Sequence, residues 1–166
     1  MTRAHIAIDT ETTTISVTNE QQDVVAFTFP CGATTLHRQH LMTDPPLPEQ
    51  LTNAIGEMID HLDDASRELP ALADSREISV SGASTVAIAA VEHGGDITSS
   101  TFQLSRAAAE DVFRTLATES RSDRRHNPGL PSQLADTIVG GCCALVALFR
   151  TLHLDVVDVV VKVEHR

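Results

Sequence analysis

The most constraining feature of the sequence is a long apolar segment near its C-terminus. Residues 132–153 have the spacing of a helix and carry apolar side chains around nearly its whole circumference. A helix without a polar face has to lie deep in the fold. Residues 156–163 follow as an apolar run interrupted only by Asp158 and Lys162, which is typical of a central strand covered on both faces. This helix and strand are therefore expected to lie at the centre of an α/β fold.

The first thirty residues have the pattern of an antiparallel meander. Three short β-rich runs cover residues 5–9, 14–18 and 24–29. Polar residues at 10–13 and 19–23 separate these runs, which predicts two tight turns.

The middle of the chain alternates between helical and extended patterns. Residues 31–41 predict a short helix that ends before a proline-rich segment, and residues 49–66 follow the helical repeat closely. A strand is predicted at residues 78–81 and a helix of small residues at 84–91, and residues 98–104 are a candidate for a further edge strand.

A further amphipathic helix follows Ser105, which is a good N-cap. Its expected buried stripe is Ala109, Val112, Phe113 and Leu116. Residues 119–131 are polar and predict a surface loop that holds the basic cluster Arg121, Arg124, Arg125 and His126. Such a cluster attracts polyphosphate or, more commonly, is simply solvated.

Length, composition and charge limit the classes of protein to which this sequence can belong. The 166 residues fit one domain, which we assign to residues 1–166. Hydrophobic residues make up 42 % and charged residues 21 %, a globular rather than a disordered composition. The net charge of −11 repels a phosphate backbone, and a chain without Trp or Tyr offers little base stacking. Nucleic acid is therefore excluded as a general partner.

The sequence also bears on membranes and compartment. It contains no apolar stretch of about 18 residues, and its N-terminus passes into a strand pattern without a signal-peptide core. We expect a cytoplasmic protein with no membrane partner. The three cysteines are odd in number and lack zinc-site spacing, so reduced, buried thiols are expected.

The order of the predicted elements favours one architecture. Three antiparallel strands, then helix, strand, helices and a last buried strand, is the order of an RNase H-like lobe, the unit of the actin, sugar-kinase and Hsp70 superfamily. The expected fold is this α/β lobe, with a mixed five-stranded sheet flanked by helices.

Four segments carry motifs that match those of one family in order and spacing. Residues 6–17 occupy the place of the hairpin motif I-D-I-G-G-G-S-T-E-L, residues 29–46 contain FPCGA, Leu36, Arg38 and DPP, residues 81–85 read SGAST, and residues 124–141 contain RRHNPGLP and ADTIVGG. These segments resemble the second lobe of the catalytic core of the exopolyphosphatase and guanosine pentaphosphate phosphohydrolase family (Ppx/GppA).

The resemblance implies a phosphohydrolase lobe. Enzymes of this family bind polyphosphate or the guanosine pentaphosphate tail between two lobes, use Mg²⁺ and carry a general-base glutamate on the first lobe. The first lobe has no counterpart in this sequence, so the chain is expected to be inactive alone. Expected partners are a separate first lobe, another protein or a second copy, with polyphosphate or a guanine nucleotide as ligand. The alternative is a non-catalytic binding or interaction module derived from the family.

The same resemblance assigns phosphate-binding residues to the first turn and to the loop after the fourth strand. They are Asp9, Glu11, Thr12, Thr13, Thr14, Gly82, Ala83, Ser84 and Thr85, with Asp9 also the candidate Mg²⁺ ligand. The start of a helix at residues 82–85 favours an anion on physical grounds as well. The residues alone also fit a turn aspartate at position 9 and a Ser84 N-cap.

Several positions depart from the family pattern. Glu11, Thr12 and Thr13 stand where the family has glycines whose N–H groups surround a phosphate, so this nest is not expected to form. Glu11 is also expected to repel a phosphate. Ser16 stands in place of a glutamate, and Thr35 and Leu134 in place of arginines. The closing S-E-x-D motif matches residues 162–165 only with a two-residue insertion.

Histidines and cysteines offer weaker candidates. His37 and His40 are three residues apart on a predicted helix, a spacing that suits a metal, but no third ligand is evident nearby, so two solvated histidines are favoured. Cys142 and Cys143 have no neighbouring histidine, which argues against a thiol nucleophile.

Overall fold

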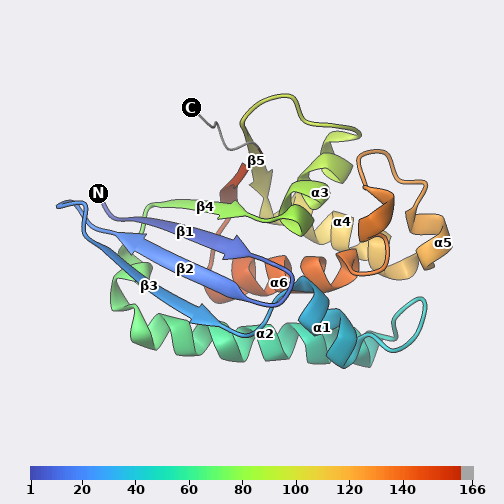
Figure 1. Cartoon of the computed structure of the whole chain (residues 1–166), viewed down its shortest axis with the longest axis horizontal. Helices are drawn as coiled ribbons and strands as arrows, with labels where there is room; N and C mark the ends of the chain where they lie inside the picture. The colour runs from blue at the N-terminus through green and yellow to red at the C-terminus, as the bar shows by residue number, and fades with distance from the viewer. Residues whose placement is uncertain (162–166) are drawn as a thin grey trace.

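A computed structural model of the chain describes residues 1–161 and consists of a mixed sheet with helices packed against it (Figure 1). The sheet has six strands in the order β3-β2-β1-β4-β6-β5. Their bounds are β1 Arg3–Ile8, β2 Thr13–Thr18, β3 Val24–Phe29, β4 Glu77–Ser81, β5 Thr101–Ser105 and β6 Val156–Val160. The first three strands form the expected antiparallel meander.

The remaining strands make the sheet mixed. β4 pairs with β1 in parallel, β6 pairs with β4 in parallel, and β5 closes the far edge antiparallel to β6. The predicted count of five strands was therefore wrong by one. The additional strand is the candidate edge segment, because Thr101 to Ser105 pair along their whole length with β6.

The helices fill the connections between these strands. Their bounds are α1 Ala33–His40, α2 Pro48–Glu68, α3 Ala83–His93, α4 Arg106–Thr118, α5 Arg121–Arg124 and α6 Ile138–Thr151, with short 3-10 turns η1 at Pro70–Asp74 and η2 at Ser132–Leu134. Ser105 caps α4 as predicted, because its hydroxyl accepts a hydrogen bond from the Ala108 N–H at 3.1 Å. None of the helices among residues 1–161 is both long and apolar enough to cross a membrane.

Helix α6 lies at the centre of the helical layer. It packs against α1, α2, α3 and α4, and all its residues from Ile138 to Phe149 are buried. The predicted burial is confirmed, but the predicted start at residue 132 was wrong. Residues 132–134 form a separate 3-10 turn, and the Thr137 N–H closes onto the Leu134 carbonyl at 3.2 Å before α6 begins.

The sheet is well buried on one face only. In Figure 1 it lies above the layer formed by α2, α6 and α1. Inward residues such as Ile6, Val80 and Val159 are fully buried, whereas their neighbours along the strands remain partly open. Strand β6 follows this alternation, so the prediction that both its faces are covered was wrong: Val156 is 48 % exposed.

The open face carries polar side chains that join the two central strands. The His5 ring on β1 lies 2.7 Å from the Ser79 hydroxyl through Nδ1 and 2.9 Å from the Ser81 hydroxyl through Nε2, and both serines belong to β4. Partial burial lowers the pKa of His5. The β1–β4 pairing that positions the candidate site is therefore reinforced by side-chain hydrogen bonds.

Candidate functional site

The candidate site lies where the parallel strands β1 and β4 end. Ala7 of β1 is paired with Ser81 of β4, so the turn after Ile8 and the loop at Gly82 meet at the same edge of the sheet. A pocket of about 170 Å³ opens there. It is lined by Ile8, Asp9, Thr10, Thr34, Ala83, Ser84, Leu134 and Thr137.

This pocket brings together some of the residues assigned from the sequence. Asp9, Ala83 and Ser84 line it, whereas Glu11, Thr12, Thr13, Thr14, Gly82 and Thr85 are not among its lining residues. Thr34 and Thr137 also line the pocket, and sequence reasoning missed both of them. A signal was available, because each threonine stands at the start of a predicted helix or just before an apolar helical run.

Three helices begin around the pocket, but their N-termini are not equivalent. The first N–H groups of α1 are occupied by the turn: Ala33 donates to the Asp9 carbonyl at 3.0 Å and Thr34 to the Thr10 carbonyl at 2.9 Å. In α3 the cap residue is Gly82, which has no side chain to offer, and its carbonyl accepts from Val86. The first N–H groups of α3 are therefore free at the pocket, and so are those of α6, since no carbonyl among residues 1–161 accepts from Ile138, Val139 or Gly140.

The N–H groups of Ala83, Ser84 and Thr85 have no carbonyl partner within residues 1–161. Helix N–H groups of this kind, together with the helix dipole, favour an anion. Ser84 is buried and is not the helix cap, so the alternative of a Ser84 N-cap was wrong.

Gly82 is required by the backbone at this point. Its φ of +126° lies in a region that side chains rarely adopt, and a Cβ there would overlap the Ile8 carbonyl oxygen. Gly141 of α6 has a related role, because a Cβ at that position would lie 2.5 Å from the Ser84 Cβ. Both glycines let α3 begin directly against the end of β1 and the start of α6.

The turn between β1 and β2 has an ordinary backbone. Asp9 N–H donates to the Thr12 carbonyl at 2.9 Å, and no residue of the turn has a positive φ. Thr13 is fully buried and donates its hydroxyl to the Cys31 carbonyl at 2.7 Å. The Thr14 hydroxyl lies 2.9 Å from that of Thr28 on β3. The hydroxyls of Thr13 and Thr14 are therefore engaged with the neighbouring residues Cys31 and Thr28.

The carboxylate of Glu11 is hydrogen-bonded to side chains of helix α1. Arg38 donates to both of its carboxylate oxygens, at 3.1 and 3.0 Å, and the Thr35 hydroxyl lies 3.4 Å from Oε2. The hydrogen bonds from Arg38 hold the pKa of the Glu11 carboxyl below its ordinary value. Its negative charge is therefore compensated locally, which the sequence argument for repulsion did not include.

The basic loop contributes to a different pocket. This second cavity, of about 210 Å³, is lined in part by His37, Asp44, Arg121, Arg124 and Asp136. Arg124 is 3 % exposed and donates to the carbonyls of Leu116 at 2.8 Å and Ala135 at 2.9 Å. The expectation that the basic cluster is simply solvated was wrong for this residue.

The two predicted histidines of α1 do not share a site. His37 lines the second cavity, where its Nδ1 is buried without a hydrogen-bond partner in the described chain. His40 Nε2 lies 3.2 Å from a carboxylate oxygen of Glu57 on α2. Both rings are partly buried, so the prediction of two solvated histidines was wrong.

All three cysteines are free and buried, as expected. Burial raises the pKa of the Cys142 thiol, and it raises that of the Cys143 thiol to about 12. Neither is therefore suited to act as a thiolate nucleophile.

The chain is similar to known proteins in its structure but not detectably in its sequence. No protein-family model and no curated protein sequence matches the chain. Solved structures do match. An exopolyphosphatase-like protein superposes over 93 % of this chain and 55 % of its own length, with a TM-score of 0.84 and 19 % identity.

Two further structures agree. The Ppx/GppA phosphatase of Aquifex aeolicus (type II variant) has a TM-score of 0.78 at 15 % identity, and an exopolyphosphatase from Cytophaga hutchinsonii has 0.79 at 14 %. Each covers 95 % of this chain and is itself covered over 53 % of its length. The chain has the fold of one Ppx/GppA lobe. It thus spans about half the length of the Ppx/GppA structures that it matches.

The structure locates the positions at which the motif resemblance expects a departure from the family. Leu134, expected in place of one family arginine, lines the pocket. Thr35, expected in place of another, is buried and directs its hydroxyl to Glu11. Ser16 lies on β2 opposite His5, on the more open face of the sheet. The match proposed for the closing motif at residues 162–165 lies outside the described residues.

Proposed function

We propose that this chain is the phosphate-binding lobe of an exopolyphosphatase-like phosphohydrolase. The pocket at the ends of β1 and β4 would take a phosphate group of polyphosphate or of guanosine pentaphosphate. The observation that carries this proposal is the free N-terminus of α3 at a pocket that Thr34, Ser84 and Thr137 line. Hydroxyl and backbone N–H donors are the groups that hold phosphate oxygens without a cation.

Asp9 gives the pocket a place for Mg²⁺. It is exposed and, among residues 1–161, is the only carboxylate that lines this pocket. Mg²⁺ commonly binds through one or two carboxylates together with water and substrate phosphates, so Asp9 fits the ion when a phosphate is present. The ion would neutralise phosphate charge in an acidic protein, and Asp9 would hold it at the pocket mouth.

Hydrolysis is not expected from this lobe alone. In-line attack on a phosphate requires a positioned water and a base on the side opposite the leaving group. The pocket supplies one wall, and Asp9 is its only ionisable lining residue within the described part of the chain. By resemblance to the family, the base belongs to a first lobe, supplied by the same protein or by another chain. The proposal includes a cytoplasmic location, which the three free thiols support.

A second candidate is a non-catalytic interaction module with the same fold. It is favoured by the absence of any Lys or Arg of residues 1–161 from the pocket lining and by Leu134, which the resemblance sets in place of an arginine. In that case the partner would be another protein or a second copy of the chain. The module would then bind its partner without binding phosphate.

Calorimetric titration with tripolyphosphate in the presence of Mg²⁺ tests the first proposal. The variants Thr34→Val and Thr137→Val each remove one hydroxyl from a residue that lines the pocket and keep the shape of the side chain. Each should weaken binding about fivefold, because one such hydrogen bond contributes roughly 1 kcal/mol. Thr28→Val on the exposed edge of β3 is the matched control and should bind as wild type does.

Two outcomes would reject the phosphate-binding lobe. One is a chain that binds no tripolyphosphate but associates with itself or another protein, which is the result expected of the module. The other is binding that neither threonine substitution weakens. A parallel phosphate-release assay should show no turnover, because the base is not part of this pocket.

A further inference from the structure

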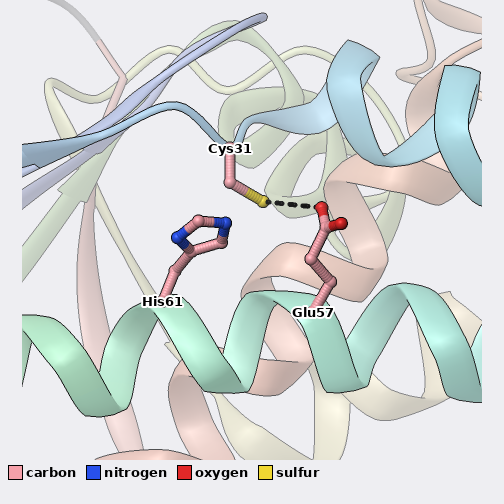
Figure 2. A group of neighbouring side chains, drawn as sticks. All are labelled: Cys31, Glu57 and His61. Atoms are coloured by element: carbon pink, nitrogen blue, oxygen red, sulfur yellow. Dashed lines mark hydrogen bonds between the residues drawn. The ribbon is translucent and has the colours of Figure 1, made fainter.

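A second group of chemically active side chains lies away from the phosphate pocket. Cys31 follows β3 and precedes α1, while Glu57 and His61 stand one turn apart on α2. Figure 2 shows the three side chains converging in the space between these elements. Their ligand atoms, one sulfur, one carboxylate oxygen and one ring nitrogen, all lie within 4.8 Å of one another.

The separations are close to those of a metal site. In a tetrahedral zinc site, bond lengths of about 2.0–2.3 Å place a sulfur and an oxygen or nitrogen ligand about 3.5 Å apart. Cys31 Sγ already lies 3.7 Å from Glu57 Oε2. The cysteine and glutamate are thus already near the separation of two zinc ligands, and the histidine nitrogen lies within 4.8 Å of both.

The surroundings hold two of these ligands in place. His40 of α1 lies 3.2 Å from the second oxygen of Glu57. The ring of His61 stacks on Phe29, with the ring centroids 5.1 Å apart and the planes 2° from parallel. Partners of this kind orient the residues that bind a metal and are a regular part of metal sites.

The chemistry of the ligands indicates which metal. A thiolate, an imidazole and a carboxylate are the three ligand types of zinc proteins, whereas Mg²⁺ prefers oxygen ligands alone. A thiolate and a carboxylate carry two negative charges, so a divalent ion gives a neutral site, as a buried position requires. Cys31 is fully buried.

We propose that Cys31, Glu57 and His61 bind a zinc ion, with His40 as the residue that positions the Glu57 carboxylate. The fourth ligand would be a water molecule, as in sites with three protein ligands. The ion would link the β3–α1 junction to α2. Because Gly32 and α1 follow Cys31 directly, this link would also hold the start of α1 against the Asp9–Thr10 turn of the phosphate pocket.

Cobalt substitution tests the site without any phosphate ligand, so its result is independent of the proposed function. The full chain, freed of metal by a chelator, is titrated with Co²⁺ and then with Zn²⁺. We expect one equivalent of Co²⁺ to produce a thiolate-to-cobalt charge-transfer band and the intense visible bands of tetrahedral coordination. Zn²⁺ should remove both sets of bands, and an excess of Mg²⁺ should leave them unchanged.

Substitutions identify the ligands. Cys31→Ala should abolish the charge-transfer band, whereas Cys143→Ala, a matched change at another buried thiol, should keep it. His61→Asn should keep the band but weaken Co²⁺ binding, and His126→Gln, at an exposed histidine, should have no effect. His40→Ala should weaken binding by about 10- to 100-fold, as is typical of outer-shell partners.

The proposal fails if wild type shows no charge-transfer band, or if the band survives in Cys31→Ala. If Cys31→Ala does not fold, His61→Asn decides the question, because its side chain is only half-buried. Co²⁺ affinity equal to that of wild type in His61→Asn would then overturn the assignment.

Discussion

Arg38 binds the carboxylate of Glu11 through both terminal nitrogens, Nη1 to Oε1 at 3.1 Å and Nη2 to Oε2 at 3.0 Å. The pair connects helix α1 to the turn between β1 and β2, two residues from Asp9 of the phosphate pocket. Both side chains are more than half exposed, so solvent screens the pair and its value for stability is small. Its main effect is on the charge beside the pocket.

The first prediction concerns this charge. Glu11→Gln should raise the affinity for tripolyphosphate about twofold, and Arg38→Gln should lower it by a similar factor, since one unit charge at about 10 Å in water contributes roughly 0.4 kcal/mol. Titration calorimetry at low salt measures both. Glu20→Gln, at the opposite end of the β1–β2 hairpin, is the control. Changes in the same direction for both variants would contradict the prediction.

A second prediction concerns the glycine that brings α3 to the end of β1. Gly82→Ala should destabilise the fold by several kcal/mol, because its φ of +126° and the nearby Ile8 carbonyl both exclude a Cβ. Gly56→Ala is the matched control within α2, where a Cβ would meet nothing within 4 Å. It should stabilise the fold by about 0.5–1 kcal/mol through helix propensity. Urea unfolding followed by circular dichroism distinguishes the two, and equal midpoints would be evidence against this backbone geometry.

Arg124 supports a third prediction. Arg124→Met should lower the free energy of unfolding by roughly 3 kcal/mol, because the buried carbonyls of Leu116 and Ala135 lose their donor. Arg125→Met, at the exposed neighbour, should change it by less than about 0.5 kcal/mol. Chemical denaturation of both variants is the measurement. A stable Arg124→Met protein would mean that the loop does not depend on this side chain.

The fourth prediction follows from His5. Burial lowers the pKa of its imidazole below 6.5, so the unfolded chain takes up a proton at a pH where the folded chain does not. The stability contribution is complete above about pH 6.5 and is lost as the pH falls from there through the folded pKa. Urea unfolding at a series of pH values should show this loss.

His5→Gln should make the pH dependence shallower, although His37, whose pKa burial also lowers, would keep part of it. His126→Gln, at an exposed histidine, should retain the wild-type slope. A slope that is the same in all three proteins would show that His5 does not contribute.

The sequence predicts the order of strands and helices because, in most elements, the local pattern of apolar residues agrees with the structure that forms. In α2 the apolar residues follow the helical repeat in the sequence, and Ala54, Met58 and Leu62 are buried. The start of α6 cannot be read from the sequence, because residues 132–137 have a composition that suits a helix. In the structure a 3-10 turn stabilised by tertiary packing replaces the first turns of the predicted helix. The covering of β6 was misjudged for a related reason: an apolar run does not show on which face the helices pack.

The candidate site was predictable only in part. Asp9 and Ser84 could be found from motif positions, but the occupation of the α1 N-terminus by the carbonyls of the turn depends on how two segments meet. The compensation of Glu11 by Arg38 likewise joins residues 27 apart. The proposed zinc ligands were missed because Cys31 lies far in sequence from Glu57 and His61. The spacing of Glu57 and His61 at i and i+4 on an expected helix was the available signal.

Phosphate is expected to bind at the N-terminus of α3. The most direct measurement is a nuclear magnetic resonance titration of the ¹⁵N-labelled chain with tripolyphosphate and Mg²⁺. The amide signals of Ala83, Ser84 and Thr85 should shift most, followed by those of Thr34 and Thr137. Shifts concentrated at the basic residues of 121–126, or no shifts at saturating ligand, would contradict it.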